Sequence, residues 1–140
     1  ELAMRKVLKQ TGIHADQIDY INAHATSTPG GDKKEAWAIN QVFGKRPYVS
    51  STKSMTGHEC WMAGASELIY SILMMRDGFL APNINFTEGD EETSKINVIN
   101  EKIDFNPEVI LSNSFGFLKI KSIEQAIDLG EEVKRPLDLC

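Results

Sequence analysis

The chain has 140 residues, of which 41% are hydrophobic and 25% charged, so it suits one globular domain and excludes a disordered, collagen-like or coiled-coil protein. Its 15 basic and 20 acidic residues give a formal charge of -5, which excludes the basic surface of a nucleic-acid-binding protein. Two cysteines, Cys60 and Cys140, are too few for a disulfide framework and favour a cytoplasmic protein. The longest apolar-rich stretch, residues 60–75, is interrupted by polar side chains and is shorter than the ~20 residues of a membrane span.

Helical periodicity and short apolar runs alternate along the chain, which predicts a layered α/β fold. In chain order we expect a helix from Leu2 to a stop at Thr11-Gly12, a strand over 18–23, a helix over 32–43, a strand over 48–50, a helix over 61–76, and strands over 96–99 and 109–112. The helix over 61–76 is apolar on most of its circumference, which indicates burial in the core. Asp32 is well placed as the N-cap of its helix, and Glu35 completes a capping-box spacing. Residues 118–140 predict an amphipathic, largely charged helix and tail.

Two histidines lie in polar loops that follow predicted strands. His24 follows the strand over 18–23, and His58 ends the loop after the strand over 48–50. In an α/β fold such loops gather at the carboxyl edge of the sheet, where ligands bind. Two neutral imidazoles at this edge can donate hydrogen bonds to one carbonyl oxygen on which negative charge develops.

A buried ion pair is predicted beside these histidines. Glu67 is the only acidic residue in the middle of the otherwise apolar helix over 61–76. An unpaired buried carboxylate costs several kcal/mol, so we expect a cationic partner or a bound ion. Lys53, five residues before His58, is the partner that we predict.

Simpler interpretations exist for each of these residues. A loop histidine is more often a packing or surface residue than a catalyst. His24, His58 and Cys60 can be drawn as a zinc site, but a fourth ligand and the usual paired spacing are absent from the sequence. Spacing assigns no histidine base to Cys60, and a cysteine is most often a small buried residue rather than a nucleophile.

Three segments of the sequence closely resemble the β-ketoacyl-[acyl carrier protein] synthases of types I and II. They are Asn22-Ala-His-Ala-Thr-Ser-Thr-Pro-Gly-Gly-Asp32, Ser51-Thr-Lys-Ser-Met-Thr-Gly-His58 and Ser112-Asn-Ser-Phe-Gly-Phe117, and they occur in the order of that family. The similarity covers about residues 1–117 and corresponds to the C-terminal half of a thiolase-like layered fold, in which helices pack on a mixed sheet. Residues 118–140 are then expected to form a divergent tail.

The resemblance implies a role for the histidines and for the ion pair. His24 and His58 resemble the two histidines that hold the malonyl thioester carbonyl and stabilise the enolate formed when carbon dioxide leaves. Lys53 resembles the family lysine that keeps this site ordered, and Glu67 resembles its carboxylate partner. The pairing inferred from burial agrees with this correspondence.

The resemblance also implies binding residues. Thr26 and Thr28 resemble the threonines that hydrogen-bond the phosphopantetheine arm of the carrier protein, and Phe117 resembles the gate residue whose backbone N–H helps form the oxyanion hole. In some members a monovalent cation is surrounded by residues that match Asn22, Glu67, Ser112 and Asn113. No resident cofactor is expected, because phosphopantetheine arrives on the carrier protein.

The implied function is fatty-acid elongation, a decarboxylative Claisen condensation of malonyl and acyl thioesters presented by acyl carrier protein. The family's nucleophilic cysteine lies in an N-terminal half that has no counterpart here, and residues 118–121 replace a glycine-rich segment after Phe117. Ala25 stands where many members have glycine. We therefore expect a chain that is inactive alone and forms a homodimer or a complex with a cysteine-bearing N-terminal half. The alternatives are a non-catalytic pairing or carrier-protein-binding subunit and a decayed gene product.

Overall fold

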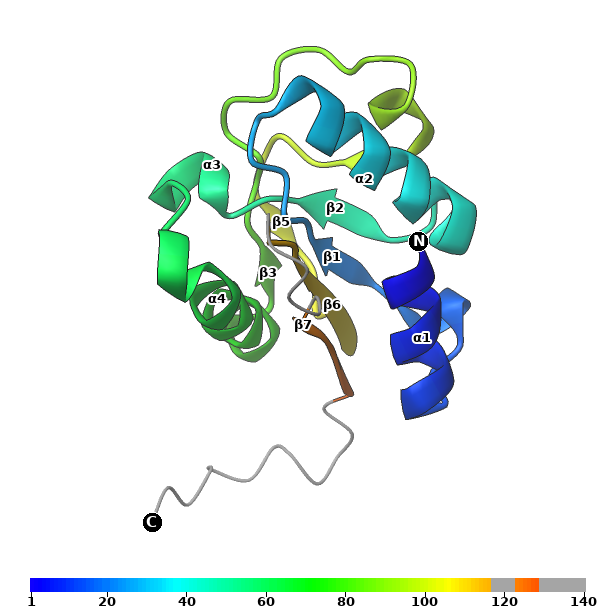
Figure 1. Cartoon of the computed structure of the whole chain (residues 1–140). Coiled ribbons are helices and arrows are strands. Elements are labelled where there is room, and N and C mark those ends of the chain that lie inside the picture. The colour runs from blue at the N-terminus through cyan, green and yellow to red at the C-terminus, as the bar shows by residue number, and fades with distance from the viewer. Residues whose placement is uncertain (117–122, 129–140) are drawn as a thin grey trace.

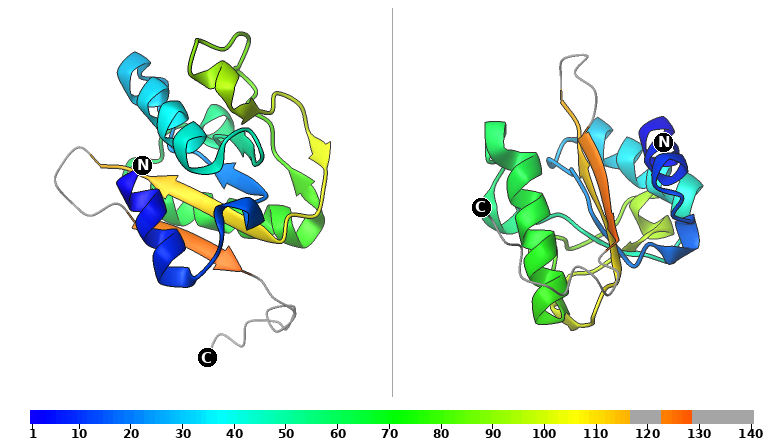
Figure 2. Two further views of the ribbon diagram at one scale, coloured as in Figure 1. Left: turned by 90° about the vertical axis from the view of Figure 1, so that its right-hand side faces the viewer. Right: turned by 90° about the horizontal axis from the view of Figure 1, so that it is seen from below.

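The computed structural model describes residues 1–116 and 123–128, in which a five-stranded sheet lies between helices (Figures 1 and 2). The helices are α1 (Leu2–Thr11), α2 (Pro29–Phe43), α3 (Lys53–Thr56) and α4 (Ala63–Asp77), with 3-10 turns at Ala15–Gln17, Cys60–Met62 and Thr93–Lys95. The strands are β1 (Tyr20–Asn22), β2 (Tyr48–Ser50), β3 (Phe79–Leu80), β4 (Asn97–Val98), β5 (Ile103–Asp104), β6 (Val109–Ser114) and β7 (Ile123–Asp128). Figure 2 shows α4 on one face of the sheet and α1 and α2 on the other, which confirms the expected α/β class.

The sheet is mixed, as expected, and its parallel part determines where the loops emerge. The strand order is β4-β2-β1-β6-β7, in which the first four strands are parallel and β7 is antiparallel to β6. Asn22, the last residue of β1, lies beside Ser50 of β2 and Ser112 of β6. The segments that follow these three residues therefore leave the same edge of the sheet.

Alternating side chains of β1 hold the two helical layers against the sheet. Tyr20 belongs to a buried cluster with Met74 of α4, whereas Ile21 belongs to a cluster with Met4 of α1 and Ile39 of α2. All five of these side chains are at most 2% exposed. Each buried aliphatic side chain contributes about 1.5–3 kcal/mol, so this alternation fixes both layers on the strands that carry the loops.

The sequence predicts that the helix over 61–76 is buried on most of its circumference. This prediction is wrong for α4 within this chain. Its buried residues are mainly small or polar: Ala63, Ser66, Glu67, Ser71 and Met74. A side-chain carbon at Gly64 would lie only 3.2 Å from Ser114 Oγ. Because glycine has no side chain, α4 can approach β6 closely here. Ile69 is 55% exposed, so part of the apolar surface of α4 faces away from the sheet.

The predicted start of the second helix is also wrong. α2 begins at Pro29, because Thr28 has the extended conformation of an N-cap and proline is pre-organised for the first helical position. Asp32 therefore lies inside the helix, where its Oδ1 accepts the backbone N–H of Thr28 at 3.3 Å. The expected capping box does not form, since the Glu35 carboxylate is directed to the preceding loop instead.

Two further segments differ from the sequence-based expectations. Residues 123–128, expected to be helical, form the strand β7, which pairs with β6 over its whole length. The expected loop after β2 contains the short helix α3. The division into a domain over 1–117 and a tail over 118–140 stays a prediction, although β7 adds a strand to the sheet from the tail side. Within the described residues, no helix combines the length and the apolarity needed to cross a membrane.

Candidate active site

The two histidines lie close together at the carboxyl edge of the sheet. His24 follows β1 by two residues, and His58 follows α3, which comes directly after β2. Their ring centroids are 5.7 Å apart and the ring planes are at 85°. Phe115, which follows β6, also packs edge to face on His24 at 5.7 Å. Parallel neighbouring strands therefore bring together side chains that are far apart in the sequence, as the loop pattern predicted.

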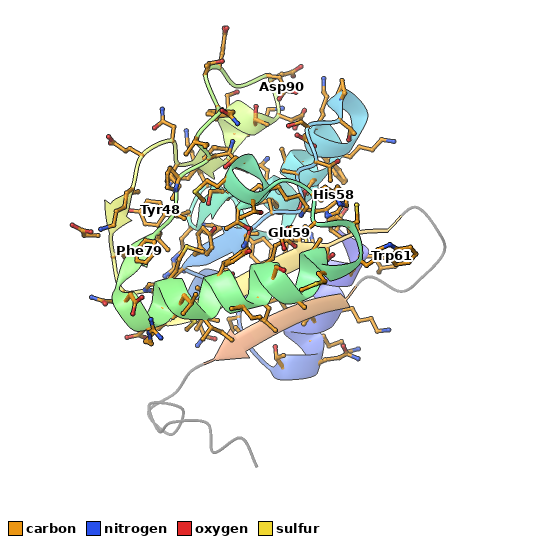
Figure 3. All side chains as sticks on the ribbon, turned by 90° about the vertical axis from the view of Figure 1, so that its left-hand side faces the viewer. Tyr48, His58, Glu59, Trp61, Phe79 and Asp90 are labelled. Carbon is orange, nitrogen blue, oxygen red and sulfur yellow. The ribbon has the colours of Figure 1, made fainter. Side chains whose placement is uncertain are left out.

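The two rings differ in their surroundings. His24 is half-buried, and its Nδ1 is buried without a hydrogen-bond partner among the described residues. His58 is exposed. Figure 3 shows His58 near the N-terminal end of α4, with Trp61 pointing away from the body of the protein.

Burial keeps the His24 imidazole neutral. Desolvation lowers the pKa of His24 to about 4, and the electrostatic influence of Lys53 and of His58 acts in the same direction. Burial also lowers the pKa of Lys53 to about 8, against the opposing effect of nearby carboxylates, of which Glu35 has the largest influence. At pH 7 the site therefore holds a neutral imidazole beside a charged ammonium group.

The predicted pairing of Lys53 with Glu67 is confirmed. Lys53 Nζ donates to Glu67 Oε1, and the two side chains are only 6% and 3% exposed. Glu67 comes from α4 and Lys53 from the start of α3, so the ion pair joins the loop after β2 to the helix that covers the sheet. Removing one partner of such a buried pair costs about 3–5 kcal/mol, because the other charge is left without compensation.

Asn22 connects the same elements through a buried amide. Its Nδ2 donates to Thr52 Oγ1 at 3.2 Å and to the Glu67 carbonyl oxygen at 3.3 Å, and it lies 3.4 Å from Ser71 Oγ. Its Oδ1 accepts the backbone N–H of Thr52 at 3.3 Å. Asn22 therefore ties the end of β1 to α4 and to the residue before Lys53.

The Asn22 and Asn113 amides, two of the four groups expected around a monovalent cation, are directed to different layers. The Asn22 amide is directed to Glu67 and Ser71 on α4, whereas the Asn113 amide donates to Glu35 on α2, on the other face of the sheet. Glu67 Oε2 and Asn113 Oδ1 are both buried without a partner among the described residues, but they belong to opposite layers. The Asn113 amide is thus directed away from Asn22 and Glu67, and the monovalent cation at Asn22, Glu67, Ser112 and Asn113 stays a prediction.

The zinc and nucleophile interpretations of Cys60 gain no support. Over residues 1–116 and 123–128, no group of three or more His, Cys, Asp or Glu residues is placed to hold a metal ion. Cys60 is a free, exposed thiol in the turn before α4, not the small buried residue that its type suggests.

Two adjoining hollows surround the histidines. One is lined by residues that include His24, Thr26, Thr28 and Phe115. The other, an open cleft of about 820 Å³, is lined by residues that include Lys53, His58, Asn83 and Phe86. Ala25, Thr26 and Asp32 line both. The hydroxyls of Thr26 and Thr28 are 3.4 Å apart. Phe117, the expected gate residue, lies outside the described residues.

Glu35 is a site residue that the sequence analysis missed. Its carboxylate is buried and accepts hydrogen bonds from the backbone N–H groups of His24 and Ala25 and from the Asn113 amide. Burial raises the pKa of Glu35, while these three donors lower it. The sequence does carry a signal for this role, an acidic residue next to apolar positions of a helix. Glu35 is buried on α2 together with Ala36 and Ile39, in the same way as Glu67 is buried on α4.

Comparison with known proteins decides the family. Residues 1–87 match the sequence model described as "Beta-ketoacyl synthase, C-terminal domain". The chain belongs to this family. Over 101 residues this synthase domain is 52% identical to 3-oxoacyl-[acyl-carrier-protein] synthase 1 of Escherichia coli, which covers 71% of the chain and 25% of that protein. The chain spans about a quarter of the length of the curated relatives it matches.

Solved structures of the same kind share the fold. A beta-ketoacyl synthase from Burkholderia phymatum superposes with a TM-score of 0.76 at 36% identity, over 83% of this synthase domain and 29% of that chain. A type II polyketide ketosynthase, whose structure is described as a complex with its acyl-carrier protein, gives a TM-score of 0.76 at 30% identity, over 81% and 29% of the two chains. The domain therefore has the C-terminal part of a thiolase-like ketosynthase fold.

The state of His24 predicts how stability depends on pH. The pKa of His24 in the folded protein is about 4, below the ordinary value of about 6.5, so the unfolded chain binds the additional proton between these pH values. The contribution of His24 to folding stability is therefore complete above pH 6.5 and is lost as the pH falls toward 4. Urea unfolding of the wild type and of His24→Asn at pH 7 and pH 5 measures this: the wild type should lose more stability than the variant. Imidazole resonances of His24 that titrate near pH 6.5 would contradict this assignment.

Two neighbouring glycines of α2 predict opposite results on substitution. A side-chain carbon at Gly31 would lie 2.3 Å from Thr28 Oγ1, whereas one at Gly30 would meet nothing within 4 Å. Gly30→Ala should therefore raise the free energy of unfolding by up to about 1 kcal/mol, since alanine favours the helix. Gly31→Ala should lose that gain and shift the Thr28 methyl resonance, because the hydroxyl must rotate. The two variants can be compared by thermal unfolding and by methyl NMR; equal effects would show that Thr28 is not packed over this turn.

Proposed function

We propose that this chain supplies the condensation half of a 3-oxoacyl-[acyl carrier protein] synthase, which elongates an acyl chain by decarboxylative Claisen condensation. The observation that supports this most is the pair of histidine rings at 5.7 Å, one of them neutral at pH 7, at the edge of the sheet. Loss of carbon dioxide from a malonyl thioester leaves negative charge on the thioester oxygen. Neutral N–H donors aimed at that oxygen stabilise the charge without a change in their own protonation.

In this proposal His24 and His58 donate to the thioester oxygen and are the catalytic residues. Lys53 and Glu67 keep the loop after β2 in place through their buried ion pair and lie outside the reacting atoms. Thr26 and Thr28 line the hollow beside His24 and are proposed to bind the phosphopantetheine arm. The Phe117 backbone N–H is proposed as an oxyanion-hole donor, in keeping with the family correspondence.

Acyl carrier protein is the proposed partner, and malonyl and acyl thioesters are the proposed substrates. One related ketosynthase of similar fold is described in complex with its acyl-carrier protein. The nucleophile that carries the acyl group is proposed to come from a cysteine-bearing N-terminal half, since the relatives are about four times longer than the matched segment.

An exposed apolar surface supports the proposed association. Trp61 is fully exposed, and Met62 and Ile69 are 64% and 55% exposed. These three side chains lie on α4 and the turn before it, where the sequence predicts a covered helix. A second chain that packs there would bury the apolar surface that this chain leaves in water. The proposed occupant is the cysteine-bearing half; a second copy of this chain is the alternative.

The function is tested by reconstitution. The isolated chain should not elongate an acyl primer with malonyl-acyl carrier protein, and addition of a cysteine-bearing N-terminal half should restore elongation.

In the reconstituted enzyme, His24→Ala or His58→Ala should each lower kcat by about a hundredfold or more, the usual effect of losing a donor to a developing oxyanion. His14→Ala, in an exposed turn outside the site, is the matched control. Elongation by the isolated chain would refute the missing-nucleophile argument, and a stable complex without activity would favour a non-catalytic pairing subunit.

The ordering role of Lys53 is tested by a single and a double variant. Lys53→Met should lower the free energy of unfolding by about 3–5 kcal/mol, because it leaves Glu67 buried and charged. Adding Glu67→Gln removes that charge and should restore most of the stability, while elongation stays impaired because the loop after β2 loses its tie to α4. Urea unfolding and initial rates on the reconstituted enzyme measure both effects. An unchanged rate for Lys53→Met would count against the ordering role.

A further inference from the structure

The chain turns sharply at His58, between α3 and α4. His58 lies between Gly57, with φ 79°, and Glu59, with φ 53°. Cys60 follows with φ 43°, so two consecutive residues other than glycine adopt the left-handed region directly after the histidine. Glycine adopts this region freely, whereas other residues persist there only where their surroundings hold them. The turn therefore depends on a contact that holds Glu59.

The Glu59 side chain makes this contact by reaching back over α4. Glu59 Oε1 accepts the hydroxyl hydrogen of Tyr70 at 3.0 Å. Tyr70 belongs to α4, so the bond joins the turn after His58 to the helix that covers the sheet. In Figure 3 Glu59 lies over the ribbon of α4, whereas Trp61, two residues later, points away from the protein. The carboxylate is thus directed inward at a turn whose next large side chain faces outward.

The surroundings of the Glu59 carboxylate suit its ionised form. The hydroxyls of Ser66 and Thr56 have the largest effect in lowering the pKa of Glu59. The Tyr70 hydroxyl and the charge of Lys53 lower it as well. The hydrogen bond to Glu59 raises the pKa of the Tyr70 phenol, which therefore stays a donor at neutral pH. Since Thr56 ends α3 and Ser66 and Tyr70 belong to α4, one carboxylate meets donors from both helices that flank the turn.

The ion pair of Lys53 holds the chain only before His58. Lys53 begins α3, five residues before His58, and its ammonium group is paired with Glu67. A side-chain carbon at Gly57, between them, would meet nothing within 4 Å, so open space adjoins the chain just before the histidine. The direction of the main chain on the other side of His58 is therefore set by the contact of Glu59 with α4.

We propose that Glu59 is the positioning residue of His58, and that its hydrogen bond to Tyr70 fixes the turn on α4. This bond sets the main-chain direction at His58 and with it the approach of the ring to His24, at 5.7 Å between the centroids. Glu59 acts through the backbone and lies outside the proposed reacting atoms. The assignment of a reaction to His58 rests on the proposed function, but the positioning itself does not.

The first measurement is the nuclear Overhauser contact between the His24 and His58 rings in the chain as it stands. Glu59→Ala and Tyr70→Phe should each abolish the contact that the wild type shows, because each removes the Glu59–Tyr70 hydrogen bond. Glu59→Gln keeps an acceptor oxygen for the Tyr70 hydroxyl and should preserve the contact. Tyr48→Phe, which removes a hydroxyl at the start of β2, is the matched control and should leave the contact unchanged.

The second measurement is a double-mutant cycle on kcat of the reconstituted enzyme. Glu59→Ala and Tyr70→Phe should each lower kcat about tenfold with KM unchanged, because a displaced catalytic group lowers the rate rather than substrate binding. The combined variant should lose no more than either single variant, since both substitutions remove the same contact. Glu59→Gln should restore most of the rate.

Glu59→Gly separates positioning from folding. Glycine adopts the left-handed region freely, so this variant should keep the melting temperature of the wild type and still lose the ring contact and about tenfold in kcat. An intact ring contact in folded Glu59→Ala or Glu59→Gly, or additive losses in the double-mutant cycle, would overturn the proposal. Loss of the ring contact in these variants, with no elongation by the reconstituted wild type, would support the positioning role of Glu59 and refute only the proposed function.

Discussion

The parallel pairing of β1 with β2 is the constraint on which the site depends. Because Asn22 lies beside Ser50, the two polar loops leave adjacent strands at the same edge, and His24 and His58 come within 5.7 Å of each other. Antiparallel pairing would send the two loops to opposite edges. Asn22 reinforces the arrangement, since its amide bonds the residue before Lys53 and the main chain of α4 at once. The same register that closes the core therefore also assembles the candidate site.

Each charged side chain around the histidines has a group that compensates its charge. Lys53 is matched by Glu67, and Glu35 and Asp32 are matched by backbone N–H groups of the loop that carries His24. The carboxylates of Glu35 and Asp32 are compensated by backbone N–H groups. Burial, together with the nearby Lys53 ammonium, lowers the pKa of His24 and keeps its imidazole neutral. A neutral ring can donate a hydrogen bond from one nitrogen to a developing oxyanion, so the way the carboxylates are satisfied matters to the chemistry proposed for the site.

α4 shows how one helix meets two different demands. Its small and polar residues, with Gly64 against Ser114, let it lie close on the sheet and place Glu67 next to Lys53. Its residue Ile69 is instead exposed on the other side, together with Trp61 and Met62 in the preceding turn. Large apolar side chains in water are costly for an isolated domain. Their exposure fits a domain that spans about a quarter of the length of its relatives.

The α/β class, the places of the two polar loops and the Lys53–Glu67 pair could all be predicted from the sequence, because local periodicity and the cost of a lone buried charge are properties of short segments. The sequence could not determine that Glu35 serves the His24 loop, since a glutamate three residues after an aspartate satisfies a capping pattern equally well. Nor could it show that residues 123–128 form a strand, or that Asn22 and Asn113 face opposite layers. Glu35 and Asn113 are 78 positions apart. Their contact depends on the rotation of α2 against the sheet and on the register of β6, which packing of the whole core decides.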